Sequence, residues 1–246
     1  MRLARAMLLL VVLAGTAPAS RAGELVVIAS TDPAVQSGSI VDGNRSLEIV
    51  ANASVVLISS TGKRIELSGP YIGAPEASAS KSGSRLVQSL SQLINKHGHT
   101  PEKLAAFRSA DRQAPAARPD IWGVDIAHAG TYCLRPDQAV MLWWDGARAD
   151  AVVSLSGPAG DGHEARIRWP GGQRSLAWPQ ALVLADGATY LVRFRATDPG
   201  IALITLQMPP LGTDAERAAW MAEHGCIRQA LEVVDAIAGD ALAPRP

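Results

Sequence analysis

The chain is poor in aromatic residues and carries no excess of charge of either sign. Only 4 % of its 246 residues are aromatic although 48 % are hydrophobic, so alanine and valine must supply much of any core. Lysine plus arginine and aspartate plus glutamate each total 23. Nucleic-acid binding needs a concentrated Lys/Arg surface, and binding to an anionic membrane surface needs a polybasic segment. The sequence therefore argues against both kinds of partner.

Long hydrophobic runs are also missing. A membrane-spanning helix needs about 20 apolar residues, and no stretch beyond the N-terminal region approaches this length. The N-terminus has two arginines, an apolar run over residues 6–14 and small residues suited to cleavage after Ala19 or Ala22, which is the pattern of a secretory signal peptide. The alternative, a membrane anchor, needs a longer run. We expect residues 1–22 to be removed and the mature chain to be a periplasmic protein that is not integral to the membrane.

Cysteine occurs only twice, as Cys133 and Cys226. The two are far apart in the sequence, which excludes a CxxC redox pair. In an exported chain a pair of cysteines is a candidate disulfide, and a bridge that closes so long a loop stabilises a protein by ~2–4 kcal/mol. We predict a Cys133–Cys226 disulfide, with two buried unpaired thiols as the alternative.

Motifs for catalysis or cofactor binding are absent. The chain has no phosphate-binding loop, HExxH, SxxK or CxxC, and the serines in residues 153–160 do not lie in a G-x-S-x-G elbow. A histidine beside a carboxylate can act as a general base, but solvated turns explain the histidine-carboxylate neighbours of this chain more simply. We expect no catalytic site, no metal site and no cofactor. A metal-dependent or serine hydrolase is kept as an alternative, and it would use His128 or His163 with Asp125, Asp161 or Glu164.

Short strand-like segments fill residues 23–75. They cover residues 25–29, 46–50, 54–60 and 63–69, and Thr61-Gly62 joins the last two. In the last segment apolar and polar residues alternate, so one side of that strand faces water. The pattern predicts a small antiparallel β-domain.

Residues 38–70 read G-x-I-V-x-G, then L-x-I, then A-S-V-V-L-I-S-S-T-G-K-x-I-x-L-S-G-P. This pattern is similar to the β-rich periplasmic domain of FecR-like proteins, and the resemblance implies short strands separated by glycine turns. FecR-type signal transducers carry a cytoplasmic helical segment and a transmembrane helix before that domain, whereas a cleavable signal precedes it here. Their signalling role is therefore not implied. The layout of the whole chain resembles uncharacterised exported bacterial proteins, which implies location and shape.

Residues 76–120 predict a linker that contains one amphipathic helix, over residues 84–96. The apolar residues of this helix recur at helical spacing; they are Leu86, Leu90, Leu93 and Ile94. His97 and His99 follow at its end, where the helix dipole favours a protonated histidine. A metal would need further ligands to converge on the pair, so we interpret both histidines as helix-end residues. The Pro/Ala-rich residues 108–120 are expected to be exposed.

Residues 121–210 predict an immunoglobulin-like antiparallel β-sandwich of about 7–8 strands, because strand-like runs recur at the spacing of such folds. Asp-Gly, Gly-Gly and Asp-Pro-Gly turns separate these runs. Five of the six tryptophans lie here. We interpret them as core residues or cross-strand pairs, with Trp169 and Trp178, on either side of the Gly171-Gly172 turn, as the candidate pair. Alternatively, Trp144, Trp169 and Trp178 form a ligand-binding platform for sugars, which would make the chain a carbohydrate- or cell-wall-binding module.

Residues 211–246 predict two C-terminal helices. Thr213 and Glu216 have the spacing of a capping box, and Gly225 suits the end of the first helix. The second helix carries an apolar stripe that must be buried. We expect this hairpin to pack on the sandwich. The fold as a whole is expected to be mainly β with flanking helices, and the function to be that of a non-catalytic exported scaffold or adaptor with a protein partner in the periplasm or at the envelope.

Overall fold

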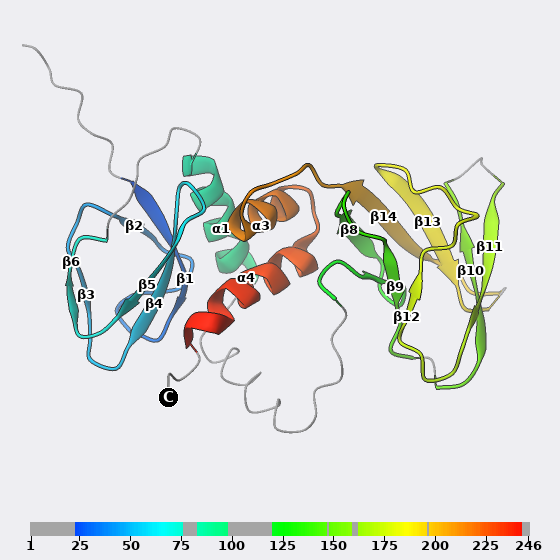
Figure 1. Cartoon of the computed structure of the whole chain (residues 1–246), viewed down its shortest axis with the longest axis horizontal. Coiled ribbons are helices and arrows are strands. Elements are labelled where there is room, and N and C mark those ends of the chain that lie inside the picture. Colours follow the sequence, from blue (N-terminus) through cyan, green and yellow to red (C-terminus); the bar gives the residue numbers. More distant parts are fainter. Residues whose placement is uncertain are drawn as a thin grey trace, which may run out of the picture.

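The computed structural model describes residues 23–75, 83–97 and 120–242, apart from residues 147, 159–161 and 196. Two β-regions lie at opposite ends of an elongated molecule, and a layer of helices lies between them (Figure 1). The predicted fold class, mainly β with helices packed on the sheets, is confirmed.

The N-terminal region contains a four-stranded antiparallel sheet and a two-stranded one. The larger sheet has the order β2-β1-β4-β5 and is built from β1 (Glu24–Ser30), β2 (Ile40–Asp42), β4 (Ser54–Ser59) and β5 (Arg64–Ser68). The smaller one pairs β3 (Leu47–Ile49) with β6 (Tyr71–Gly73). Because successive side chains point to opposite faces of a strand, β1 buries Leu25 and Val27 on the side of β3 and β6, and Val26 and Ile28 on the side of the helices.

Three described helices form the middle layer: α1 (Gly83–His97), α3 (Asp214–Glu223) and α4 (Ile227–Leu242). Their apolar faces and one face of the larger N-terminal sheet bury a single cluster, which we call the helical core. It includes Val26, Ile28, Val56, Ile58, Val87, Leu90, Leu93, Ile94, Ala218, Met221, Ala230, Val233, Val234 and Ala238. The predicted amphipathic helix is therefore a core element, although it was interpreted as part of a linker. The second part of that linker, with His99, lies outside the described residues.

The capping box at the start of α3 is confirmed. Thr213 Oγ1 accepts a hydrogen bond from the Glu216 N–H at 3.1 Å, and the Glu216 carboxylate accepts one from the Thr213 N–H at 2.8 Å. The predicted Thr61-Gly62 turn between β4 and β5 packs directly against this cap. Gly62 has φ +78°, and a Cβ at this position would collide with the Thr213 hydroxyl. The contact ties the N-terminal sheet to the tail of the chain.

The C-terminal helix α4 contacts the sandwich as predicted, at β8 (Gly130–Leu134). α4 also packs against α3 and, at β1 and β4, against the N-terminal sheet. Ala230, Val233 and Val234 belong to the same cluster as Val26 and Val56. The apolar stripe of α4 showed that the helix must be covered, but it did not show which of two available β-surfaces covers it.

The second β-region is a two-layer sandwich. One sheet has the order β11-β10-β13-β14-β8 and adds β10 (Ala151–Ser156), β11 (Glu164–Trp169), β13 (Ala188–Arg193) and β14 (Ile201–Gln207) to β8. The other has the order β12-β9-β7 and contains β7 (Val124–Asp125), β9 (Met141–Trp143) and β12 (Ser175–Ala177). Residues from both sheets bury the sandwich core, which includes Val124, Leu142, Val153, Leu155, Trp169, Tyr190, Val192 and Leu203.

The prediction that every sandwich strand is antiparallel to its neighbours is wrong at two places. β8 runs parallel to β14, and β7 runs parallel to β9. The first of these pairs joins the beginning of the block to its end in the sequence. Alternation of apolar and polar residues defines the buried face of a strand but not its direction, so the sequence pattern carried no information on this point.

Candidate functional site

The sandwich core contains Trp169, one of the three tryptophans of the predicted ligand platform. Its side chain is 0 % exposed, and its indole N–H donates a hydrogen bond to the Gln173 carbonyl oxygen at 2.6 Å. The Trp144 ring meets Trp169 edge-on with ring centroids 5.6 Å apart, and it also lies 4.6 Å from the Phe194 ring. Trp169 is thus enclosed by protein and offers no face to a ligand.

Trp178 packs against a different aromatic ring. Its ring meets Tyr190 edge-on at 4.9 Å, and its indole N–H donates to the Leu182 carbonyl oxygen at 2.8 Å. The predicted pairing of Trp178 with Trp169 is wrong, because β12 pairs with β9 in the other sheet and not with β11. The structure therefore does not bring the three tryptophans together on an exposed face.

A network of polar side chains joins α4 to the sandwich, and Asp125 lies at its centre. The Asp125 side chain is 3 % exposed. Arg228 Nη1 donates to Asp125 Oδ2 at 2.8 Å, and His128 Nδ1 lies 2.7 Å from the same oxygen. The Tyr132 hydroxyl is 2.7 Å from the Asp125 carbonyl oxygen, and it accepts a hydrogen bond from Arg228 Nη2 at 3.1 Å. The buried carboxylate is thus paired with a cation, as a buried charge requires.

Burial of this network changes the acidity of Tyr132. Loss of solvation raises the pKa of its phenol to about 12, although the positive charge of Arg228 works in the opposite direction. The phenol therefore stays protonated at neutral pH. The Arg228 guanidinium also lies over the Tyr132 ring, 5.3 Å from its centroid, which adds a cation–π contact to the hydrogen bond.

The predicted disulfide lies beside this network. Cys133 of β8 and Cys226, the residue before α4, are bonded, with their Cα atoms 5.9 Å apart. The Gln229 side chain forms two hydrogen bonds with the same strand. Its Oε1 accepts from the Cys133 N–H at 2.7 Å, and its Nε2 donates to the Cys133 carbonyl oxygen at 3.0 Å. We call the disulfide, the Gln229 contacts and the Arg228–Asp125 pair the junction.

The junction has one feature of a catalytic site. Asp125 orients His128, whose side chain is 71 % exposed, and a carboxylate that orients a histidine is common in general-base catalysis. Among the described residues, however, no serine, threonine or cysteine side chain hydrogen-bonds to His128, and Asp125 is also held by Arg228. The arrangement is that of a structural network which fastens β7 and β8 to α4.

The other predicted catalytic residues are not gathered into a site. Asp161 lies outside the described residues, and His163 is exposed at the start of β11. Glu164 forms an exposed ion pair with Arg166 at 3.3 Å. Over the described ranges, no three His, Cys, Asp or Glu side chains are close enough to hold a metal ion.

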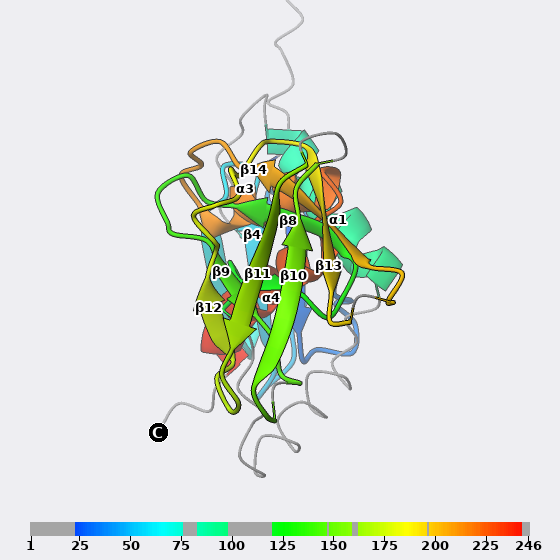
Figure 2. The ribbon, with the colours of Figure 1, turned by 90° about the vertical axis from the view of Figure 1, so that its right-hand side faces the viewer.

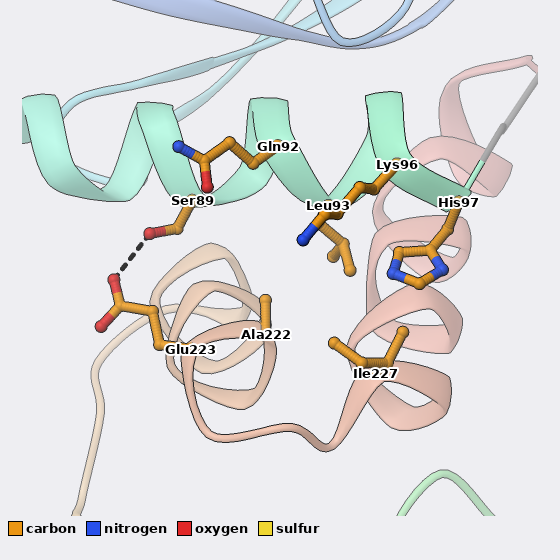
Figure 3. Close-up of a pocket in the computed structure, with 8 residues that line it drawn as sticks. All are labelled: Ser89, Gln92, Leu93, Lys96, His97, Ala222, Glu223 and Ile227. Carbon is orange, nitrogen blue, oxygen red and sulfur yellow. Dashed lines mark hydrogen bonds between the residues drawn. The ribbon is translucent and has the colours of Figure 1, made fainter.

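A small hollow lies where α1, α3 and α4 meet (Figure 3). It has a volume of about 130 Å³ and is lined by Ser89, Gln92, Leu93, Lys96, His97, Ala222, Glu223 and Ile227. The Ser89 hydroxyl donates to the Glu223 carboxylate at 2.6 Å across it. Ligand pockets in proteins usually measure about 300–1,000 Å³, so this hollow is too small for a cofactor. His97 lies at the end of α1, as predicted.

Arg228 and Gln229, which carry the junction, were not predicted from the sequence. The spacing of Gln229 from Cys226 was the available signal, because residues three apart on a helix lie on one face and Cys226 was already expected to contact the sandwich. Comparison with protein-family models and with curated proteins found no match to this chain. In the part of the chain that the structure describes, no helix combines the length and the apolar character needed to cross a membrane.

Proposed function

We propose that the chain is a non-catalytic scaffold or adaptor that is exported to the periplasm and acts through a protein partner there or at the envelope. The observation that carries the proposal is the junction. Cys226, Arg228 and Gln229 fasten the sandwich to a helical layer that already shares its core with the N-terminal sheet. A protein that positions a partner needs a rigid frame, and the junction holds the two β-regions in a fixed arrangement.

Two further observations support export. Residues 1–22 have the pattern of a cleavable signal, and the disulfide belongs to a class of bond that persists mainly in oxidising compartments. Sequencing the N-terminus of protein purified from native cells tests this part of the proposal. A mature chain that begins after Ala19 or Ala22 is expected, and a chain that retains Met1 in the cytoplasmic fraction contradicts it.

The adaptor role is tested by affinity capture from periplasmic and envelope fractions, with reversible cross-linking and mass spectrometry. The intact full chain is compared with a Cys133→Ala/Cys226→Ala variant. We expect a protein that the intact chain retains and the variant retains more weakly, because the variant loosens the relation between the two β-regions. If the intact chain retains no protein above a tag-only background, the adaptor role is wrong.

The 2.7 Å contact between Asp125 and His128 is the single observation that favours the hydrolase alternative. An esterase and peptidase screen of the full chain tests it, with His128→Ala compared against His163→Ala. Turnover that is lost only in the first variant would establish a hydrolase. We expect no turnover from either variant or from the unmodified chain.

A further inference from the structure

The longest exposed sheet edge of the described residues belongs to β11. This strand has six residues and pairs only with β10. Figure 2 looks toward β10 and β11 at the end of the molecule away from the helices, where no helix covers them. An exposed edge of this length is a template for a further strand, unless its side chains prevent pairing.

Half of the backbone groups of β11 point to this open side. The Gly157 N–H donates to the His163 carbonyl oxygen at 2.9 Å, which fixes the alternation of the β10–β11 ladder. The N–H and C=O groups of Glu164, Arg166 and Arg168 therefore point away from β10. Within the described ranges, no backbone group of another segment bonds to them. A row of donors and acceptors is thus available to a partner's main chain.

The outer face of this edge carries two arginines, Arg166 and Arg168, and one carboxylate, Glu164. Arg166 and Arg168 lie on the outer face of the sheet, with side chains 79 % and 83 % exposed. Arg193 belongs to the same face, because it is in register with Ser154, which is in register with Arg166. On the inner face of β11, Ala165 and Trp169 are buried.

The carboxylates that now contact these arginines are weakly held. Arg166 lies 3.3 Å from Glu164 and Arg168 lies 3.5 Å from Asp150, and both carboxylates are at least 44 % exposed. Exposed ion pairs of this kind contribute little to stability. Carboxylates from another chain can therefore take their place.

We infer that the β11 edge binds an extended acidic segment of a protein partner by strand addition. The inference rests on the proposed adaptor function and names the place where the adaptor holds its partner. Acidic side chains at alternate positions of the added strand face Arg166 and Arg168, and the intervening side chains lie beside half-buried Ile167. An anionic polysaccharide or membrane offers no main chain to the outward-pointing N–H and C=O groups.

The experiment uses the full chain and a capped, fluorescein-labelled eight-residue peptide of alternating glutamate and valine. Its matched controls are a lysine–valine peptide and a glutamate–valine peptide N-methylated at every residue, which has no backbone N–H to donate to the edge. The protein variants are Arg166→Glu/Arg168→Glu and, as a control with the same change in charge, Arg45→Glu/Lys63→Glu on exposed residues of the N-terminal region. Binding is followed by fluorescence anisotropy, and circular dichroism confirms that each variant is folded.

We expect the glutamate–valine peptide to bind the unmodified chain and the Arg45/Lys63 variant equally, and the Arg166/Arg168 variant about tenfold more weakly, since two cross-strand charge pairs are reversed. The lysine–valine peptide should show the opposite preference. Equal binding of the N-methylated peptide overturns strand addition, and no binding of any peptide overturns the inference as a whole. Self-association of the chain that depends on Arg166 would assign the edge to a second copy instead.

The same Arg166/Arg168 variant, used in the partner capture described above, separates this inference from the proposed function. If capture persists in this variant, the adaptor binds its partner elsewhere and only the inference fails. If the unmodified chain captures nothing, the adaptor function itself fails.

Discussion

The two cores of the molecule are assembled from very different spans of sequence. The helical core joins Val26 of β1 to Ala238 of α4. The sandwich core draws only on residues between Val124 and Leu203. The sandwich can therefore bury its apolar residues without help from the rest of the chain, whereas the N-terminal sheet depends on α1, α3 and α4 to cover one face.

Because of this difference, the folding units do not follow one another in the sequence. The sandwich is an insertion between two halves of a second unit, which is completed only when the C-terminal helices return to β1 and β4. The junction is the one place where the two units are covalently linked beyond the chain itself. If the cores are as independent as this arrangement implies, a substitution in one should leave the other intact.

The largest difference in protection between the two cores is expected from Trp169→Ala. Removing a fully buried tryptophan costs about 3–5 kcal/mol, and the loss should be confined to the sandwich. Hydrogen exchange followed by mass spectrometry measures this, with protection expected to fall in β10, β13 and β14 but not in β1 and β4. Val183→Ala is the control, because Val183 is 82 % exposed and surface changes usually alter stability by less than about 0.5 kcal/mol. An equal loss of protection in β1 would mean that the two cores unfold as one.

Leu90→Ala tests the opposite unit. Leu90 on α1 is 0 % exposed in the helical core, and a buried Leu→Ala change costs about 2–5 kcal/mol. Protection should fall together in β1, β4 and α4, although these segments are far apart in the sequence. Gln92→Ala, an exposed change on the same helix, is the matched control. If α4 keeps its protection while β1 loses it, the tail helix belongs to the sandwich, as its sequence first suggested.

Local sequence patterns predicted the helices and strands of this molecule better than they predicted which of these elements pack together. Three features were predicted: the apolar positions of α1, the capping box at Thr213 and the Cys133–Cys226 pair. Each depends on the type and spacing of residues, which the sequence gives directly. The contact of Val26 with the helices and the parallel pairing of β8 with β14 were not predicted. β1 is apolar on both faces, so its pattern does not indicate which element covers which side.

The site was predicted less well than the fold for a similar reason. The ligand platform was predicted from three tryptophans, Trp144, Trp169 and Trp178, because aromatic residues are rare in this chain. Residue type alone does not distinguish a buried indole from an exposed one. Arg228 and Gln229 lie on a helix whose predicted feature was its apolar stripe. Their role became visible only when the structure placed them against Asp125 and the Cys133 backbone.

Removal of the disulfide tests the link between the two units. Cys133→Ala/Cys226→Ala is expected to lower the free energy of unfolding by about 2–4 kcal/mol, measured by urea denaturation of matched preparations. The Arg228 and Gln229 contacts remain, so the folded structure should persist, and the two unfolding transitions should separate more widely than in the unmodified chain. Arg45→Ala, an exposed turn residue, serves as the control. An unchanged free energy of unfolding would show that Gln229 and Arg228 alone fix the junction.

The smallest effect is expected from the ionisation of Tyr132, because nothing changes at neutral pH. Its pKa is about 12 in the folded chain against an ordinary value of 10.0. A group whose pKa is raised by folding contributes stability that is complete below the unfolded pKa and is lost as the pH rises through the folded one. The junction should therefore weaken only between about pH 10 and pH 12.

Tyrosinate absorbance after a rapid pH jump measures the ionisation before the disulfide can exchange. A late ionisation step is expected, and Tyr132→Phe should remove it whereas Arg45→Ala, an exposed change, should leave it unchanged. If Tyr132→Phe leaves the titration curve without change in its late phase, the phenol is open to solvent and the junction is looser than its hydrogen bonds indicate.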